Sequence, residues 1–200
     1  MDTGKLDPAE GSVLDGLGER IRAMRSQRNM TLQDLFKASR VSVAMLSHIE
    51  RSRSTPSIKV LDRIRAALNV SFSAFFEETE EMSPASNAAV VTRNNERPLL
   101  KFEATGLVKE LLSPARGTHM EMMMLNLQPG GYSGEEPWRR VGEKCGIVLE
   151  GSFELTIGTQ IYNLSEKDAF QFDSSIPHSF RNTFDGMSKI MWIILSEELG

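Results

Sequence analysis

Hydrophobic positions divide the chain into a part with helical periodicity and a part with strand periodicity. In LGERIRAMRSQRNM the apolar residues Leu17, Ile21 and Met24 share one helical face, and this periodicity continues to Phe76. Later in the chain, short β-type runs such as HMEMMMLNLQ and CGIVLEGSFELTIG are separated by turn residues roughly every 8–12 positions. The pattern predicts a helical domain followed by an all-β sandwich or barrel.

The change of pattern sets the expected domain boundaries. The stretch EETEEMSPASNAAVVTRNNERPLL is acidic, then small and polar, which is typical of a linker between domains. We expect the linker to end in a strand near Val90 and Val91. The expected segments are a flexible N-terminus at 1–15, the helical domain at 16–78, the linker at 79–97 and the β domain at 98–200.

Capping residues mark the helix starts in the first domain. Thr31 precedes LQDLFKAS and has Asp34 at the capping-box position, while Ser42 precedes VAMLSHIER and Ser57 precedes IKVLDRIRAALN. A fifth short helix is predicted for SFSAFFEE, whose phenylalanines would close the bundle. The first domain is therefore predicted to be a five-helix bundle.

The charges are unevenly distributed along the chain. Residues 16–70 hold eleven Lys and Arg against four Asp and Glu, although the net charge of the whole chain is −4. A basic segment on an acidic chain indicates a local contact with nucleic acid. The single cysteine, Cys145, excludes an intrachain disulfide and favours a reducing cytosol. With no apolar N-terminal segment and no long apolar run, we expect a cytoplasmic protein without a membrane partner.

The segment TLQDLFKASRVSVAMLSHIERSRSTPSIKVLDRIRAALNVS places two helices only SRV apart, the spacing of a helix-turn-helix. It resembles the XRE, or lambda-repressor-like, family over the whole domain. The matching positions are Leu35, Ala38, Val41, Leu46, Ile49, Glu50, Pro56, Leu61, Ile64 and Leu68. Where the family often has glycine, this chain has Arg40 and Ser52; a left-handed Arg40 would cost about 1 kcal/mol. The resemblance implies that the domain binds double-stranded DNA.

On that template the third helix enters the major groove. Its exposed face carries Ser42, Val43, Ala44, Ser47, His48 and Arg51. Ser47 and His48 are expected to hydrogen-bond base edges, and Val43 and Ala44 to contact thymine methyl groups. The residues better placed for phosphates are Gln33, Arg51, Arg53 and Lys59. We expect a homodimer on a pseudo-palindromic operator, with half-sites about 34 Å apart.

The second domain resembles the cupin family, a small jelly roll. The segment LSEKDAFQFDSSIPHSFRNT matches the second cupin motif, with Pro177, His178 and Asn182 in place and Asp168 instead of the usual glycine. The segment GIVLEGSFEL matches the end of the first motif. A helix-turn-helix followed by a cupin is a known arrangement of bacterial regulators, and the two resemblances cover nearly all of the chain.

The first cupin motif lacks the family's metal ligands. Counting back from Gly151, the family's glutamate position holds Lys144, and its two histidine positions hold Arg140 and Trp138. Only the second-motif histidine, His178, remains. Cationic side chains offer no lone pair and repel a dication. We therefore predict no metal and no other cofactor.

The same positions predict an anion site. Arg140, Lys144 and His178 are expected to converge inside the barrel, where a guanidinium and an ammonium suit a carboxylate, sulfate, phosphate or phosphonate. Glu121 and Glu110 are alternative internal partners for the two cations. The remaining wall is expected to come from Met120, Met122, Met124, Tyr132, Trp138, Phe170, Phe172 and Trp192, although core packing accounts for these residues as well.

Three functions follow from these motifs. The first is a DNA-binding transcriptional regulator whose cupin senses a small anionic metabolite without a metal. The second is a metal-dependent oxygenase or epoxidase with an accessory helix-turn-helix, a chemistry that needs two histidines and a carboxylate. The third is a regulator whose cupin only dimerises. Since His178 is the one remaining ligand, the sequence favours the first function and a protein that is not an enzyme.

Overall fold

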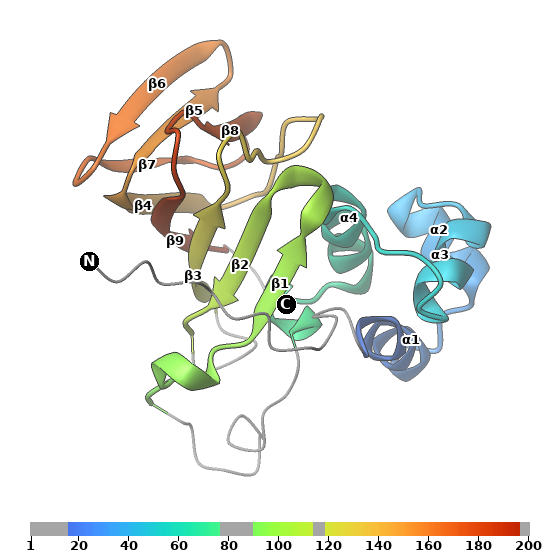
Figure 1. Ribbon diagram of the computed structural model, residues 1–200. Coiled ribbons are helices and arrows are strands. Elements are labelled where there is room, and N and C mark those ends of the chain that lie inside the picture. Colours follow the sequence, from blue (N-terminus) through green and yellow to red (C-terminus); the bar gives the residue numbers. More distant parts are fainter. Residues whose placement is uncertain (1–15, 77–89, 114–118, 197–200) are drawn as a thin grey trace.

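The computed structural model describes residues 16–76, 90–113 and 119–196 of the chain (Figure 1). A group of helices lies beside a larger body of strands, as the change in periodicity predicts. The predicted flexible N-terminus and most of the predicted linker lie outside the described residues. Among the described residues, no helix is long and apolar enough to cross a membrane.

The helical domain contains four α-helices and a 3-10 turn. They are α1 (Leu17–Gln27), α2 (Leu32–Ser39), α3 (Val43–Glu50), α4 (Ile58–Leu68) and η1 (Phe72–Phe75). The predicted caps are confirmed: the hydroxyls of Thr31, Ser42 and Ser57 each accept a backbone N–H in the first turn of α2, α3 and α4. The Thr31 cap is a full capping box with Asp34.

The predicted fifth α-helix is wrong. Residues 72–75 form only the turn η1, and Phe76 returns to extended backbone (φ −75°, ψ 153°). Phe72, Phe75 and Phe76 are buried nonetheless. Apolar residues at positions i, i+3 and i+4 fit a single turn of either helix type, so burial of the rings does not require an α-helix.

Two left-handed residues stand where the XRE family often has glycine. Arg40 ends α2 with φ 60°, and Ser52 follows α3 with φ 53°. Both are non-glycine residues in the left-handed conformation, which costs roughly 1–2 kcal/mol of conformational free energy for each. Both residues are exposed, so the side chains themselves meet no steric barrier.

The β domain consists of two antiparallel sheets. The larger sheet has the order β1-β2-β3-β9-β4-β7 and the smaller one β6-β5-β8. The strands are β1 (Leu99–Phe102), β2 (Leu107–Leu111), β3 (Met120–Leu127), β4 (Glu143–Glu150), β5 (Ser152–Ile157), β6 (Gln160–Ser165), β7 (Ala169–Asp173), β8 (His178–Asn182) and β9 (Ser188–Leu195). This two-sheet arrangement agrees with the predicted cupin.

The first strand does not lie where the sequence predicted it. Val90 and Val91 are 84% and 55% exposed and belong to no strand. The chain enters the sheet later, at Leu99, where β1 pairs with β2. Leu100 and Phe102 of β1 are buried, whereas the β-branched pair at 90–91 gains no such apolar contact.

The methionine run of β3 faces the opposite way from the prediction. Met123 is buried inside the sheet together with Glu121 and Leu125, whereas Met122 and Met124 lie on the outer face. Successive side chains of a strand point to opposite faces, so these two sets cannot both line the barrel. Met120, on the outer face as well, is 49% exposed.

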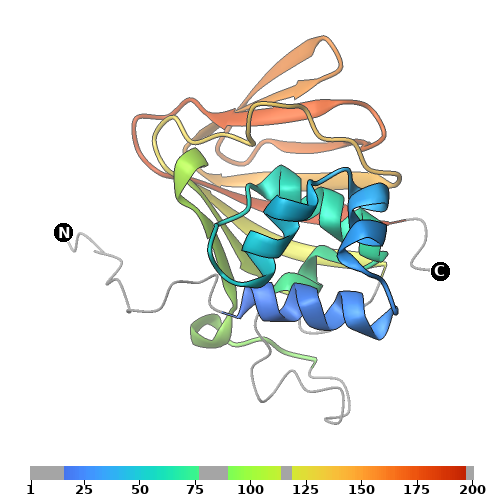
Figure 2. The same cartoon turned by 90° about the vertical axis from the view of Figure 1, so that its right-hand side faces the viewer.

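The two domains pack directly on each other. Figure 2 shows the helices lying in front of the strands of the larger sheet. Their buried apolar side chains form one continuous cluster that includes Leu61 and Phe72 of the helical domain and Leu100 and Trp192 of the β domain. The domain contact is therefore part of the hydrophobic core.

Candidate functional site

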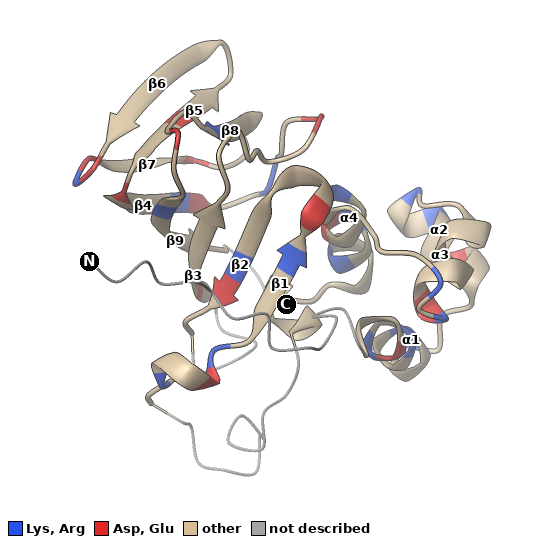
Figure 3. Cartoon of the chain, viewed as in Figure 1, with Lys and Arg blue, Asp and Glu red and all other residues tan. Residues whose placement is uncertain are grey.

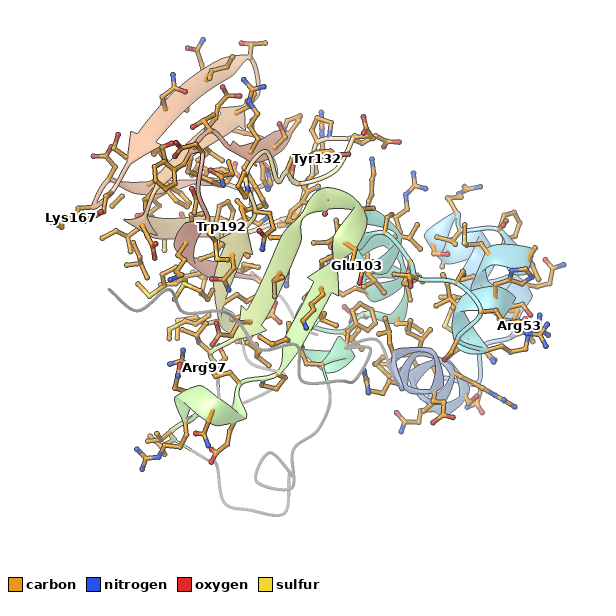
Figure 4. All side chains as sticks on the ribbon, viewed as in Figure 1. Arg53, Arg97, Glu103, Tyr132, Lys167 and Trp192 are labelled. Carbon is orange, nitrogen blue, oxygen red and sulfur yellow. The ribbon has the colours of Figure 1, made fainter. Side chains whose placement is uncertain are left out.

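The predicted DNA-contact residues belong to α2, to α3 and to the residues next to α3, with a single exception. Most are exposed or half-buried on α2, on α3 and just after α3: Gln33, Ser42, Val43, Ala44, Ser47, His48, Arg51 and Arg53. Figure 3 shows Lys and Arg spread over the helices. Figure 1 shows that α2 and α3 lie on the side of the helical domain away from the strands, and Arg53, labelled in Figure 4, lies at that edge. The exception is Lys59, which forms an ion pair with Glu136 of the β domain.

A buried ion pair holds α3 against α1. Arg25 donates to both carboxylate oxygens of Glu50, at 2.7 and 2.8 Å, and also to the carbonyl oxygen of Met30 at 2.7 Å. Glu50 is 8% exposed. The hydrogen bond to Glu50 raises the pKa of Arg25 above its ordinary value, so the guanidinium keeps its charge. The last residue of the recognition helix is thereby fixed to its support.

The predicted effector residues lead to a pocket between the domains. Its lining residues come from α4, η1, β2, the segment before β4, β4 and β9: Ile58, Asp62, Phe72, Lys109, Trp138, Arg139, Arg140, Lys144 and Ile194. The pocket brings together Trp138, Arg140 and Lys144, which the sequence singled out. Tyr132, Phe170 and His178 do not line it. The Tyr132 hydroxyl donates to Glu135 at 2.9 Å, and Phe170 packs on Phe153 and Trp192 in the barrel core.

Lys144 of the pocket contacts His178, which lies next to the lining residues. The Lys144 ammonium lies 2.7 Å from His178 Nε2, and both residues are buried. Burial and the charge of Lys144 lower the pKa of His178 to about 4, so the ring is neutral at physiological pH. His178 Nδ1 lies 2.8 Å from the Ile176 carbonyl oxygen and donates to it, so Nε2 is free to accept from Lys144.

This contact means that the residues do not fit a metal ion. The lone pair of His178 Nε2, the one remaining family ligand, points at the Lys144 ammonium. Trp138 and Arg140 supply no lone pair at the other positions. Over residues 16–76, 90–113 and 119–196, no group of three or more His, Cys, Asp and Glu side chains is placed to hold a metal.

Arg140 is shared between the pocket and the domain contact. Its guanidinium pairs with Glu121 Oε2 at 3.3 Å and donates to the Ser196 hydroxyl at 2.5 Å. The other oxygen of Glu121 accepts the backbone N–H of Ser73, in η1, at 2.7 Å. Glu121 is therefore the internal partner of Arg140, whereas Glu110, the other candidate, pairs with Arg97.

Lys109 is a site residue that sequence reasoning missed. It is 3% exposed, and its ammonium lies 4.2 Å from the ring centroid of Phe72 and 4.7 Å from that of Trp138. Within the part of the chain that the structure describes, these ring faces are its contacts, with no carboxylate or carbonyl acceptor. The sequence did hold a signal: Lys109 occupies an inward position of β2, between Leu107 and Leu111.

Lys109 should make the ligand-free protein sensitive to pH. Burial, with smaller effects of Arg140 and Arg65 against Asp62 and Glu121, lowers the pKa of Lys109 to about 7. The unfolded chain keeps this proton up to about pH 10.4, so it binds more protons than the folded state between pH 7 and 10. This group therefore makes the protein more stable as pH rises through that window, by at most about 1.4 kcal/mol per pH unit.

We expect Lys109→Met to lose that pH-dependent increase and to be more stable than the wild type at pH 7, because methionine needs no counter-charge. Urea unfolding of the two proteins at pH 7, 8 and 9 measures both effects. Equal slopes of stability against pH would show that Lys109 is already paired or solvated.

The fold and the site define a class: a two-domain protein with a helix-turn-helix domain and a cupin whose ligand positions carry cations. The sequence model described as Helix-turn-helix matches residues 21–75, and that described as Cupin domain matches residues 123–194. The chain thus carries a helix-turn-helix domain of XRE type followed by a C-terminal cupin domain.

Known regulators resemble the chain over most of its length. The HTH-type transcriptional regulator PuuR of Escherichia coli (strain K12) is 29% identical over 175 residues, covering 87% of this chain and 91% of PuuR. SutR of the same organism is 27% identical over 172 residues, covering 83% of this chain and 86% of SutR. The crystal structure of an HTH_3 family transcriptional regulator from Vibrio cholerae shares the fold, with a TM-score of 0.73, 22% identity and coverage of 94% and 100%.

Proposed function

We propose that this regulator binds operator DNA as a homodimer in the cytoplasm and that its cupin pocket senses a small anion without a metal. The observation that supports the sensor is the charge imbalance of the pocket. Lys109, Arg140 and Lys144 bring three basic groups together, and Glu121 is the buried carboxylate that offsets them. Burial lowers the pKa of Lys109 to about 7 and that of Lys144 well below its ordinary value, so a bound anion would favour the protonated form of both lysines. Asp62 adds a partly exposed carboxylate from α4. Buried cations without full compensation favour recruitment of an anion.

Binding of an anion should stabilise the protein through these cations. Propionate, propanesulfonate and propylphosphonate present three acid groups on one carbon chain, and thermal unfolding measures the increase in Tm that each produces. We expect at least one of them to raise Tm, and Arg140→Ala and Lys144→Met each to abolish the increase. Operator binding by both variants should persist, since neither residue lies on α3.

The matched control is Lys167→Met, which removes a lysine whose side chain is 86% exposed and which Figure 4 places far from the helices. That variant should keep the full anion response. If no anion raises Tm, or if Arg140→Ala and Lys144→Met respond like the wild type, the cupin does not sense anions through this pocket. The domain would then be better explained as a dimerisation module.

The alternative enzyme function lacks support in the site. A mononuclear oxygenase needs two histidines and a carboxylate with an open metal position. His178 here accepts from Lys144, and the other three ligand positions carry Trp138, Arg140 and Lys144. The relatives that match over most of the chain are transcriptional regulators.

The outer face of the larger sheet is the surface that we propose for the dimer. Met122 and Met124 of β3 lie beside Ile193 and Met191 of β9, and Met191 lies beside Ile147 of β4. These half-buried apolar side chains form a continuous patch on the face opposite the pocket. A second copy suits this patch because an operator with two half-sites requires two recognition helices related by a two-fold axis.

Met191→Lys is expected to convert the dimer to a monomer, because it places two like charges in a self-complementary apolar contact. Sedimentation equilibrium measures the change. The control is Ile161→Lys, which replaces an apolar residue that is 60% exposed on the smaller sheet and should leave the dimer intact. A Met191→Lys protein that remains dimeric would exclude this face as the interface.

A further inference from the structure

The anion pocket is walled by both domains. Ile58 and Asp62 of α4 and Phe72 of η1 face Lys109 and Lys144 of the β domain across it. Asp62 accepts from Arg65 of the same helix at 2.9 Å, and its carboxylate also attracts the pocket cations. The DNA-binding domain thus contributes a wall and a counter-charge to the cupin site.

With this wall in place the pocket is too small for a metabolite. Its free volume is about 20 Å³, which is room for one or two water molecules. An acid group attached to a carbon chain takes more space than one or two water molecules. Since Lys109 and Lys144 are each 3% exposed, an anion reaches both ammonium groups only if part of the wall moves.

The helical-domain wall of the pocket is held in place by contacts with the charged groups of the pocket itself. Glu121 accepts the Ser73 N–H of η1 at 2.7 Å while it pairs with Arg140 at 3.3 Å. The Lys109 ammonium lies against the ring of Phe72, also in η1. An anion that binds Arg140 and Lys109 therefore competes with Glu121 for the guanidinium and draws the ammonium away from Phe72.

We propose that the helix-turn-helix domain is the movable wall of the anion pocket, and that an anion entering between Arg140, Lys144 and Lys109 displaces α4 and η1. This inference rests on the proposed anion-sensing function and names its regulatory output. The incoming negative charge lies close to both Glu121 and Asp62, and like-charge repulsion weakens the contact of Glu121 with Ser73. Occupancy of the cupin is then transmitted to the DNA-binding domain by direct contact.

Reversing the charges of an ion pair outside the pocket distinguishes the effect of domain docking on anion binding from the direct effect of an added charge. Lys59 of α4 and Glu136 of the β domain form an ion pair across the domain contact, and neither lines the pocket. Lys59→Glu replaces the attraction with repulsion and loosens the wall. Lys59→Glu combined with Glu136→Lys restores an opposite-charge pair with the net charge of the wild type.

Isothermal titration with propylphosphonate measures the outcome. We expect Lys59→Glu to bind this anion about threefold more tightly than the wild type, because less docking must be broken. The double variant should return to the wild-type Kd. The sign is diagnostic, since an added negative charge would by itself weaken anion binding. Weaker binding by Lys59→Glu overturns the movable wall but leaves anion sensing intact.

Hydrogen exchange of the Ser73 amide provides a second measurement, on the wild-type protein. Its N–H donates to Glu121. Saturation with propylphosphonate should speed its exchange even as the protein as a whole becomes more stable. Slower or unchanged exchange at Ser73 in the saturated protein would refute the displacement of η1. If the titration detects no binding of propylphosphonate, propanesulfonate or propionate by the wild type, it is the proposed function itself that fails.

Discussion

Glu50→Gln is expected to lower the free energy of unfolding of the helical domain by about 3–5 kcal/mol. The substitution keeps the shape of the side chain but removes its charge, and the guanidinium of Arg25 is then left without its counter-charge. The Arg25 and Glu50 side chains are 14% and 6% exposed, so water cannot fully compensate. Loss on this scale is a large part of the stability of a small domain.

Urea unfolding followed by circular dichroism measures this loss, and operator binding should decrease with it because α3 ends at Glu50. A matched control is Glu154→Gln, which removes the partner of Arg181. The Arg181 side chain is 61% exposed, so solvent screens that pair and it contributes little to stability. Similar losses for Glu50→Gln and Glu154→Gln would show that the Arg25–Glu50 pair is not a support of the recognition helix.

Operator affinity should fall by about a thousandfold when the salt concentration rises from 50 to 200 mM. Two basic domains that each contact several phosphates release condensed counterions, and added salt opposes that release. We expect Arg51→Ala to weaken binding to all sequences alike and to reduce the salt dependence. Fluorescence anisotropy with a labelled operator duplex provides both numbers.

Ser47→Ala and His48→Ala test the sequence-reading role of the same helix. Each should weaken operator binding by about 1–3 kcal/mol while leaving affinity for unrelated duplexes unchanged. The contrast with Arg51→Ala distinguishes base contacts from phosphate contacts. If Ser47→Ala weakened operator and unrelated DNA equally, α3 would not be reading bases through that residue.

Local features of the fold were predictable because they depend on neighbours in the sequence. The caps at Thr31, Ser42 and Ser57 involve partners three residues away, so the sequence alone indicates them. The turn η1 was not predictable in this way. Its residues Phe72 and Ser73 contact Lys109 and Glu121 of the β domain, and contacts between such distant residues cannot be inferred from the spacing of its phenylalanines.

The face of β3 was ambiguous for a different reason. Its methionines occupy consecutive positions, so either set of alternating side chains could face inward. The choice depends on which face of the strand carries Glu121. A glutamate ordinarily points to solvent. Here it is buried because Arg140 and the Ser73 N–H satisfy its carboxylate, and both partners are distant in the sequence.

The pocket was half predictable. The cupin motif identified Arg140 and Lys144 because they occupy ligand positions at a countable distance from Gly151. No motif could identify Asp62 or Phe72, since they belong to the other domain and meet the pocket only through docking. The proposed sensor site is thus completed by residues from the proposed output domain.

The order of helices gives this docking a mechanical consequence. α4, which borders the pocket, follows α3 after only residues 51–57, and the cap at Ser57 fixes where α4 begins. A small rotation of α4 is therefore transmitted to α3 through this short connection. In a two-fold dimer the α3 helices of the two copies rotate in opposite senses, which changes the distance between the two recognition helices. Such a dimer would prefer operators whose half-site spacing matches the distance between its two recognition helices, and anion occupancy would change that preferred spacing.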